Sequence, residues 1–538
     1  MSAEVATEHG EGTTSSPDIH TTAGKLAQLR QFNDEAIHAG SARAVEAQHA
    51  KGKMTARERI LALLDEGSFV ETDALARHRA HDFNLDQNRP YGDGVVTGRG
   101  TIDGRPVAVY AHDNTVFGGS VGEGFGKKVC AIMDFAIKVG CPIIGINDSG
   151  GARVQDAVTS LAYYSEISRR QYPASGYVPQ ISIMLGKCAG GAVYAPVTTD
   201  FVIAVQDQAY MFVTGPDVIR QVTGEDVTMD ELGSALEQAK RGNVNHVAVS
   251  EHDAFMYVRN LLSYLPSSAS EKAPRINPGL EPETTESDRQ LDTIIPDSDN
   301  AAYDMHDVLI RMFDDGEFVE TSGQFASNII TGFARVDGEP VGVVANQPLH
   351  LSGALDIDAS EKATRHMMLC DAYSIPIVYV VDTPGYLPGV EQEKLGIIHR
   401  GAKMGFAVAA SSVPKVTFVV RKAYGGAYAV MGSKNLGGDL NFAWPTARIA
   451  VMGAEGAVDL LQRRQIEEAG PEEGPKLRQQ LIDMYNEFIA TPYTAAERGY
   501  IDAVIEPSQT RLVLRGALAQ LRDKTRVELP RKHAIFPL

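Results

Sequence analysis

The sequence predicts an α/β fold that occurs twice within one chain. Two observations carry this prediction: strand-type and helix-type segments alternate, and the same motifs recur in the same order after a nearly constant interval. The 538 residues leave room for roughly two to four domains. Glycine, with 51 residues, exceeds its usual share of about 7%. This surplus indicates tight turns or sites lined by backbone.

The internal repeat covers most of the chain. LDEGSFVET at 64–72 matches FDDGEFVET at 313–321, and Thr97-Gly98 matches Thr331-Gly332. At nearly the same interval, Pro142 matches Pro376, Asp148 matches Asp382 and Gly151 matches Gly385. Gly190-Gly191-Ala192 likewise matches Gly425-Gly426-Ala427. A repeat of this length excludes a solenoid and indicates two copies of one domain, at roughly 60–265 and 304–515.

The segments around the two copies differ in composition. Residues 1–17 are polar and predict a disordered tail. A helical head precedes the first copy, with Thr55 as the N-cap of ARERILALL. Five prolines among Ser, Glu and Asp predict an extended linker at 266–303. The expected domains are therefore 18–265 and 304–538.

Each copy shows the same order of elements. A hairpin turning at Asp103-Gly104 or Asp337-Gly338 comes first. A helix, a buried strand and a second strand follow, and the second strand leads into Gly-Gly-Ala and another helix. The expected helices are 127–139 and 360–373, and the expected strands are 143–147, 180–185, 377–381 and 415–420.

Composition excludes several classes of protein. With 69 acidic and 50 basic residues, the net charge of −19 argues against a nucleic-acid surface and against binding to anionic lipid. No apolar run is long enough to span a membrane. The four cysteines form no CxxC pair, so no zinc ribbon, other metal site or disulfide framework is expected. A cytoplasmic protein is the corresponding expectation.

Four motifs have both a chemical and a plain interpretation, and the plain one is favoured for each. Asp148-Ser149-Gly150-Gly151 is similar to the motif of a serine nucleophile, but the second copy has Asp382-Thr-Pro-Gly385, so a turn is favoured. The segment 122–128, GEGFGKK, departs from a Walker A loop and predicts a turn before a helix. His78, His81 and Asp82 predict a solvated loop, and Cys188 a small buried thiol.

The Gly-Gly-Ala turns have a stronger chemical interpretation. Each lies where a strand ends and a helix begins, and glycine lets the backbone approach a ligand closely. Amides in the first turn of a helix lack partners within that helix and can stabilise a developing oxyanion. Close helix packing explains such a turn equally well, but its occurrence in both copies favours the functional interpretation.

The chain resembles the carboxyltransferase (β) subunit of actinobacterial biotin-dependent acyl-CoA carboxylases, the propionyl-CoA carboxylase β-chain family. The resemblance spans about 18–538 and rests on a combination of motifs: GKMTARERI, DNTVFGGSVGE, NDSGGARVQD, GKCAGGAVYAP, DTPGYLPGVEQE and RKAYGGAYAVMGSKNL. It implies two tandem crotonase-like domains and a hexamer in which the first domain of one subunit faces the second domain of another.

The resemblance also implies the roles of particular residues. Acyl-CoA would lie on the first domain, with an oxyanion hole at Gly190 and Gly191. Carboxybiotin would lie on the second domain, with an oxyanion hole at Gly426 and Ala427. Substrate-binding positions would be Gly150, Gly151 and Ala429.

Biotin would be carried by a separate biotin carboxylase/carrier α subunit, because this chain has no Ala-Met-Lys-Met attachment motif and Ala402-Lys403-Met404 is only a fragment of it. A small ε subunit, and a homo- or hetero-hexamer of β chains, are further partners that the resemblance suggests.

One departure concerns the substrate. Propionyl-type members carry Asp in Gly-Gly-Ala-Tyr-Asp-Val-Met, and this chain has Ala429 there. A smaller, neutral residue favours the long-chain subgroup, which serves fatty and mycolic acid synthesis, over a propionyl- or acetyl-CoA enzyme. Three rival functions stay open: a decarboxylase or transcarboxylase subunit, a fused pair of hydratase/isomerase domains, and a scaffold without activity.

Overall fold

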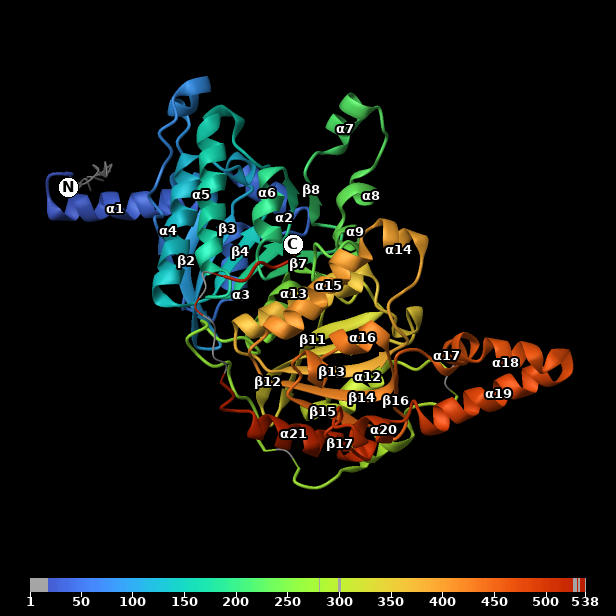
Figure 1. Ribbon diagram of the computed structural model, residues 1–538. Coiled ribbons are helices and arrows are strands. Elements are labelled where there is room, and N and C mark those ends of the chain that lie inside the picture. The colour runs from blue at the N-terminus through green and yellow to red at the C-terminus, as the bar shows by residue number, and fades with distance from the viewer. Residues whose placement is uncertain (1–17, 280, 299–300, 526–529, 531–532, 538) are drawn as a thin grey trace, which may run out of the picture.

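Each half of the chain is built around its own β-sheet (Figure 1). The computed structural model describes residues 18–279, 281–298, 301–525, 530 and 533–537. The predicted tail, 1–17, lies outside the described residues. The strands of the first half form one sheet in the order β1-β2-β3-β4-β5-β7-β9, with β6 and β8 as a separate pair. Their bounds are β1 Val70–Thr72, β2 Val95–Ile102, β3 Arg105–His112, β4 Ile143–Asn147, β5 Gln180–Met184, β6 Lys187–Ala189, β7 Phe201–Val205, β8 Tyr210–Phe212 and β9 His246–Ala248.

The second half repeats this sheet. Its order is β10-β11-β12-β13-β14-β15-β17, and β16 pairs with the far end of β14. The extended β14 thus takes the place of both β5 and β6. The bounds are β10 Val319–Thr321, β11 Ile329–Val336, β12 Glu339–Asn346, β13 Ile377–Thr383, β14 Lys415–Tyr424, β15 Leu440–Ala443, β16 Arg448–Ala450 and β17 Ala503–Val504.

The two predicted hairpins are confirmed. In each half two antiparallel strands pair to their ends, at Ile102 with Arg105 and at Val336 with Glu339. The turn residues Asp103 and Asp337 have φ of 50° and 52°, and the following glycines have φ of 75° and 78°. Two consecutive positive φ values are typical of the type I′ turn. The remaining pairs in each sheet are parallel from β3 or β12 onward.

Helices cover both faces of each sheet. On the first sheet α4 (Glu123–Val139) and α5 (Val158–Ala174) pack together on one face. On the second sheet α13 (Ile357–Ala372) and α15 (Ile397–Ala410) cover the face turned toward the first half, as Figure 1 shows. Helices α12 (Met305–Met312) and α21 (Thr510–Gln520) cover its other face. The α/β prediction is confirmed, and the predicted helices and strands agree with the observed ones except near their ends.

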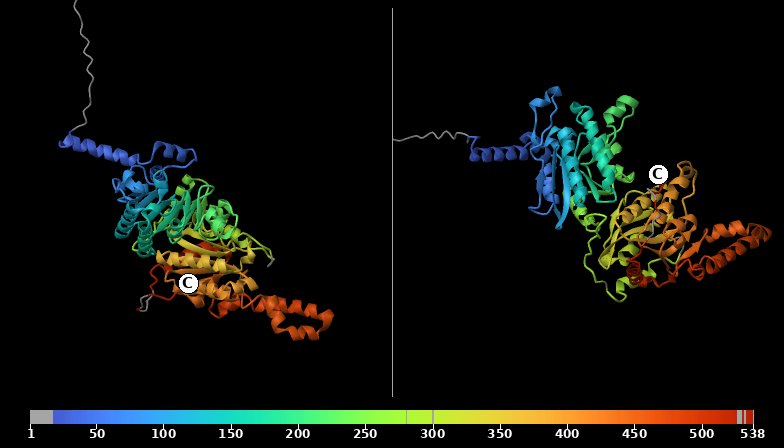
Figure 2. Two further views of the ribbon diagram at one scale, coloured as in Figure 1. Left: turned by 90° about the horizontal axis from the view of Figure 1, so that it is seen from above. Right: turned by 60° about the vertical axis from the view of Figure 1, so that its left-hand side comes forward.

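The head before the first sheet is helical, as predicted. It contains α1 (Thr22–Ile37), α2 (Ala42–His49) and α3 (Ala56–Leu63), and α1 projects from the body (Figure 2). Thr55 caps α3 through a capping box, in which the Thr55 hydroxyl accepts from the Glu58 amide and the Glu58 carboxylate accepts from the Thr55 amide. Ile60 and Leu63 of α3 are fully buried beneath the first sheet.

The remaining helices are insertions between strands or segments between the halves. Those of the first half are α6 Gly191–Val197, α7 Pro216–Thr223, α8 Met229–Gly233, α9 Ala235–Lys240 and α10 Glu251–Leu262. Those that follow are α11 Glu286–Arg289, α14 Val390–Lys394, α16 Gly425–Val430, α17 Ala454–Leu461, α18 Arg463–Glu468, α19 Gly470–Phe488 and α20 Pro492–Glu497. Helices α18 and α19 form a projecting hairpin (Figure 1).

The segment 266–303 is less extended than the sequence suggests. It contains α11 and the 3₁₀ turn Gln290–Thr293. The Asp288 carboxylate forms a buried ion pair with Arg511, at 2.7 Å between Oδ2 and Nη2. Arg511 also donates to the carbonyl oxygens of Glu281 and Glu283. These contacts fasten the segment to α21.

A continuous core joins the two halves. One buried cluster contains residues of β4, β5 and β7 together with residues of β11, β13 and α13. At the junction the rings of Phe201 and Phe333 lie 6.2 Å apart, edge to face. The Tyr373 hydroxyl donates to the Asp200 carboxylate at 2.7 Å. Among the helices of the described residues, none is both long and apolar enough to cross a membrane.

Candidate active site

The first Gly-Gly-Ala turn joins β6 to α6. Gly190 has φ of 58°, a conformation that favours glycine. Its N–H is directed to β8, toward the carbonyl oxygens of Phe212 at 3.2 Å and Val213 at 3.1 Å. Helix α6 begins at Gly191, so the helix offers no acceptor to the amides of Gly191 and Ala192. Gly190 therefore shapes the turn, and the next two residues present its amides.

The second turn repeats this geometry. Gly425 has φ of 61°, close to that of Gly190, and α16 begins there directly after β14. Gly426 is exposed and Ala427 is buried. The matching positive φ values fix the register, so Gly426 and Ala427 are equivalent to Gly191 and Ala192. The predicted pair Gly190–Gly191 thus aligns with Gly425–Gly426, one position before the predicted pair Gly426–Ala427.

Such a turn is suited to one kind of chemistry. Two neighbouring backbone amides held at the start of a helix can donate hydrogen bonds to one oxygen atom. If negative charge develops on that oxygen during a reaction, preorganised donors stabilise the transition state more than the ground state. Neither turn requires a general base or a metal ion of its own for this task.

A tyrosine ring packs against each turn. A Cβ atom added to Gly191 would lie 2.9 Å from Cε2 of Tyr164, a residue of α5. A Cβ atom added to Gly426 would lie 3.7 Å from the same atom of Tyr386, a residue of the loop after β13. The two tyrosines occupy non-equivalent positions of the repeat, so comparison of the two copies in sequence does not reveal them.

Gly150 and Gly151 lie beside the first turn. Gly151 has φ of 96°, and a Cβ atom there would lie 3.0 Å from the carbonyl oxygen of Ala189, the last residue of β6. The amide of Gly150 donates to the carbonyl oxygen of Gly118 at 3.0 Å. The structure thus brings the predicted substrate-binding glycines together with the predicted oxyanion turn.

The Asp148 side chain anchors the loop that contains Gly150 and Gly151. Its buried carboxylate accepts from Arg59 at 3.0 Å and from Lys53 at 2.6 Å. Arg59 is fully buried and also pairs with Glu251 at 2.6 Å. The cost of burial is offset here because both carboxylates of the network face cations. Gly186 is required nearby, since a Cβ atom there would lie 1.9 Å from an Asp148 oxygen.

Asp382 has the same role in the second half. It is fully buried, and its carboxylate accepts from the Arg421 side chain at 2.9 Å, the Tyr303 hydroxyl at 2.9 Å and the Lys422 amide at 3.0 Å. Burial raises the pKa of Asp382, and the neighbouring Arg421 opposes that rise. The internal repeat aligns Asp148 with Asp382, and this match is the sequence feature from which both anchoring residues could have been predicted.

Ala429 lies on α16, within the second site. It is half-buried, and its carbonyl oxygen accepts from the Ser433 hydroxyl at 2.9 Å. The atoms nearest to the glycines of each turn come only from the same half of the chain. Each half therefore builds its own amide turn, and the residues predicted for the two sites form two separate groups.

The plain interpretation is confirmed for Ser149 and Cys188. The Ser149 hydroxyl is buried and donates to the carbonyl oxygen of Gly119 at 2.7 Å, so it is not presented as a nucleophile. Cys188 is fully buried, and burial raises the pKa of its thiol to about 12. A thiol with that pKa is inert at neutral pH.

The segment 122–128 is a helix start without room for phosphate. The carboxylates of Asp156 and Asp93 accept from the amides of Glu123 and Phe125. Lys128 is buried, and its ammonium group donates to the carbonyl oxygens of Gly92 and Val95. Anions of the protein itself thus occupy the position at which a phosphate would bind.

The prediction for the histidine pair was wrong in part. His81 and Asp82 are not buried, as expected, but His78 is fully buried, and its Nε2 lies 2.9 Å from the carbonyl oxygen of Asn88. The ring of Phe117 packs edge-on against it. Across the described residues, no group of three His, Cys, Asp or Glu side chains has the arrangement of a metal site.

Comparison with known proteins identifies what these two turns belong to. The chain matches the carboxyl transferase domain family over residues 47–536. It is 58% identical to the biotin-dependent long chain acyl-coenzyme A carboxylase beta4 subunit of Mycobacterium tuberculosis, covering 98% of this chain and 100% of that one. It is 56% identical to the propionyl-CoA carboxylase beta chain of Saccharopolyspora erythraea, covering 97% of both chains.

The M. tuberculosis acetyl-/propionyl-coenzyme A carboxylase beta5 subunit is 55% identical and covers 100% of this chain and 98% of its own. Among solved structures, transcarboxylase 12S superposes with a TM-score of 0.92 at 44% identity, over 96% of this chain and 99% of that one. Both halves have the crotonase-like fold. The chain belongs to the carboxyl transferase domain family, as a carboxyltransferase β subunit of biotin-dependent acyl-CoA carboxylases.

Proposed function

We propose that the chain transfers CO2 from carboxybiotin to the α carbon of a long-chain acyl-CoA. The acyl-CoA lies on the first half, 18–265, and carboxybiotin on the second, 304–538, with 266–303 as the linker. The observation that carries this proposal is the paired geometry of the two turns at Gly190 and Gly425, each of which presents two amides at a helix start. One donor pair for each reactant is what a transfer between two carbonyl-bearing groups requires.

The first turn acts on the thioester. The amides of Gly191 and Ala192 hold the thioester oxygen, where negative charge develops as the α-proton leaves. Gly190 sets the direction of these amides through its positive φ, and Gly150 and Gly151 line the approach. Asp148 and Arg59 keep that loop in place, which serves orientation rather than proton transfer.

The second turn fits the head group of biotin. A ureido group presents one carbonyl oxygen on a compact, largely apolar bicycle. The amides of Gly426 and Ala427 supply donors, and the rings of Tyr386 and Tyr428, both half-buried, supply apolar walls. When bound, carboxybiotin supplies the CO2 and a basic nitrogen that accepts the α-proton. This chain therefore needs no general base of its own.

A second copy of the chain completes the site. Each turn is lined by its own half, and transcarboxylase 12S is described as a hexamer assembly. We place the first half of one subunit opposite the second half of another in a homo- or hetero-hexamer. Biotin is carried by a separate α subunit, an ε subunit completes the complex, and the complex is cytoplasmic.

The long-chain substrate rests on Ala429. In the hexamer proposed above, α16 of one subunit lies opposite the first half of another, so a small, neutral residue there leaves the acyl pocket larger and less polar than an aspartate would. Identities of 58%, 56% and 55% to relatives named for long-chain, propionyl-CoA and acetyl-/propionyl-CoA carboxylases are nearly equal, so propionyl- or acetyl-CoA is the second candidate.

The substrate is tested with the reconstituted holoenzyme. We expect kcat/KM for palmitoyl-CoA to exceed that for propionyl-CoA, and Ala429→Asp to reverse the order. Ser433→Ala, which removes only a hydroxyl beside α16, is the matched control. Efficient carboxylation of propionyl-CoA with none of palmitoyl-CoA would overturn the long-chain assignment.

A further inference from the structure

Each half ends one strand of its sheet with a buried polar side chain that no step of the proposed reaction uses. His112 is the last residue of β3 and is 6% exposed, and Asn346 is the last residue of β12 and is fully buried. The two positions are equivalent, because the interval between them equals that between Asp148 and Asp382. Burying a polar residue is costly unless it has a partner, so its occurrence at the same place in both copies indicates a shared task.

Both side chains accept a hydrogen bond from the backbone of an anchoring aspartate. The Asp148 amide donates to Nδ1 of His112 at 3.4 Å, and the Asp382 amide donates to Oδ1 of Asn346 at 3.1 Å. Burial lowers the pKa of His112 to about 4, so the ring is neutral near pH 7 and Nδ1 can accept. An imidazole and a carboxamide thus supply the same acceptor at the same place in the repeat.

A glycine packs against the other side of each aspartate. A Cβ atom on Gly119 would lie 2.4 Å from the carbonyl oxygen of Asp148, and one on Gly353 would lie 2.3 Å from that of Asp382. Both glycines have a positive φ, 65° and 76°, a conformation that favours glycine. The backbone of each aspartate is therefore held between a side-chain acceptor and a closely packed turn.

In the first half this arrangement affects the acyl-CoA site. Asp148 begins the loop that contains Gly151, and a Cβ atom on Gly151 would lie 3.0 Å from the carbonyl oxygen of Ala189. Ala189 is the residue before Gly190, whose φ directs the amides of the first turn. A shift of the Asp148 backbone would therefore reach that turn. Since His112 is buried, its effect on the acyl-CoA passes through this loop.

In the second half the same arrangement affects the biotin site. The loop after Asp382 carries Tyr386, whose ring would lie 3.7 Å from a Cβ atom built on Gly426 of the second turn. Loss of the acceptor at Asn346 would loosen the backbone that carries this ring. The effect would fall on the biotin head group and not on the acyl-CoA.

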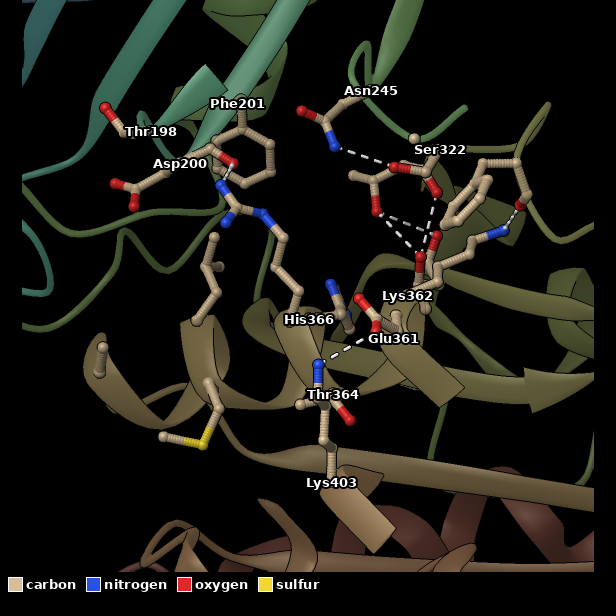
Figure 3. A pocket seen from close by; sticks show the side chains of 18 of the residues that line it. Thr198, Asp200, Phe201, Asn245, Ser322, Glu361, Lys362, Thr364, His366 and Lys403 are labelled. Carbon is tan, nitrogen blue, oxygen red and sulfur yellow. Dashed lines mark hydrogen bonds and ion pairs between the residues drawn. The ribbon is translucent and has the colours of Figure 1, made fainter. Parts of the chain in front are cut away.

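A second buried pair of the repeat has a different role. Lys128 and Lys362 are equivalent, and their ammonium groups donate to carbonyl oxygens at the start of β2 and β11. Lys362 lies at the cavity between the halves (Figure 3), where it also donates to the carbonyl oxygen of Phe325. Among the described residues that line this cavity, none is a glycine of either amide turn. Lys362 thus supports packing and provides a structural control.

We propose that His112 and Asn346 are equivalent positioning residues, His112 for the acyl-CoA and Asn346 for biotin. Each accepts from the backbone of its aspartate and so holds the loop that faces the reactant of its own half. The identity of the two reactants rests on the proposed function, whereas the two hydrogen bonds do not depend on it.

Kinetics of the purified, assembled chain test these roles. Decarboxylation of palmitoyl-CoA that carries a carboxyl group on its α carbon is measured with free biotin, and each reactant is varied in turn. His112→Leu should raise KM for the acyl-CoA by about three- to tenfold and leave KM for biotin within about twofold. Asn346→Leu should do the reverse. His112→Asn, which brings the acceptor of the second half into the first, should keep both KM values within about twofold of the wild type.

Hydrogen exchange of the backbone amides gives a readout that needs no turnover. In His112→Leu the exchange of amides 148–151 should become about three- to tenfold faster, with 382–385 unchanged, and His112→Asn should match the wild type. Lys362→Met is the control for a loss of buried hydrogen bonds elsewhere. It should lower Tm and leave both KM values and both loops unchanged.

The outcomes separate this proposal from the proposed function. Equal behaviour of His112→Leu and His112→Asn, or equal changes in both KM values in His112→Leu, would overturn the positioning role. If His112→Leu raised KM for biotin and Asn346→Leu raised KM for the acyl-CoA, the positioning role would stand and the assignment of reactants to the halves would fail. If the wild type released no CO2, the proposed function would fail, and hydrogen exchange would still decide whether the two side chains hold their loops.

Discussion

Replacing Gly191 by alanine tests the geometry of the first turn. Gly191 is a helical residue, so alanine is compatible with its backbone. The new Cβ atom would lie 2.9 Å from the Tyr164 ring, well inside the 3.4 Å at which ordinary van der Waals contact begins. Gly426→Ala is the matched control, because its Cβ atom would lie 3.7 Å from Tyr386, an ordinary contact.

The expected loss follows from the displacement. Either the Tyr164 ring or the first turn of α6 must move by several tenths of an ångström. One oxyanion donor contributes about 10²–10³ in kcat, and small misplacements of reacting groups reduce rates strongly. We therefore expect Gly191→Ala to lower kcat by about 30- to 100-fold with KM for acyl-CoA within about threefold. Gly426→Ala should change kcat by less than about threefold.

The assay is steady-state carboxylation by the reconstituted holoenzyme, with the assembly checked by light scattering. Combining Gly191→Ala with Tyr164→Leu removes the clash and should restore at least part of the lost rate, a coupling that a double-mutant cycle measures. Equal effects of Gly191→Ala and Gly426→Ala, or no recovery in the double variant, would refute the reasoning.

Two further predictions concern stability. Arg59→Met leaves the buried carboxylates of Asp148 and Glu251 without their shared cation, so it should lower the free energy of unfolding by about 3–5 kcal/mol. It should also lower kcat, because the glycine loop that Asp148 anchors loses its support. Arg57→Met, at a half-buried ion pair, is the control in thermal unfolding, and an equal loss of stability there would contradict this account. Hydrogen bonds to Glu320 and Asp304 raise the pKa of His306 to about 9. The contribution of protonated His306 to folding stability is therefore complete below pH 6.5, the ordinary pKa of histidine, and is lost as the pH rises through 9. Because the His306 side chain is 38% exposed, solvent screening reduces this stabilisation to about 1 kcal/mol. His306→Gln should therefore lower Tm at pH 6 and not at pH 10. An equal change in Tm at both pH values would refute this prediction.

The sequence was sufficient for the features that repeat. The type I′ turns at 103 and 337, the buried strand 143–147 and the turns at Gly190 and Gly425 follow from local patterns that occur twice at a fixed interval. Thr55 carries its own capping signal. Residues that are neighbours in the sequence determine such elements, so one amino-acid sequence is enough to predict them.

Features that depend on tertiary contact were not accessible in this way. Tyr164 and Tyr386 reach equivalent turns from non-equivalent positions, so no interval connects them. His78 sits in a polar stretch that predicts solvent exposure, and the packing of Phe117 and the Asn88 carbonyl oxygen bury it. The engagement of the Gly190 amide by β8 depends on a strand that lies beyond α6 and β7 in the chain.

The central claim is that this chain alone holds both halves of a carboxyl transfer, and the reverse reaction tests it without the α subunit. The purified chain is mixed with free biotin and palmitoyl-CoA that carries a labelled carboxyl group on its α carbon, and released label is measured as CO2. We expect release that saturates with biotin and falls by about 30-fold or more in Gly191→Ala. Release that is independent of biotin, or hydration of crotonyl-CoA without biotin, would contradict the account.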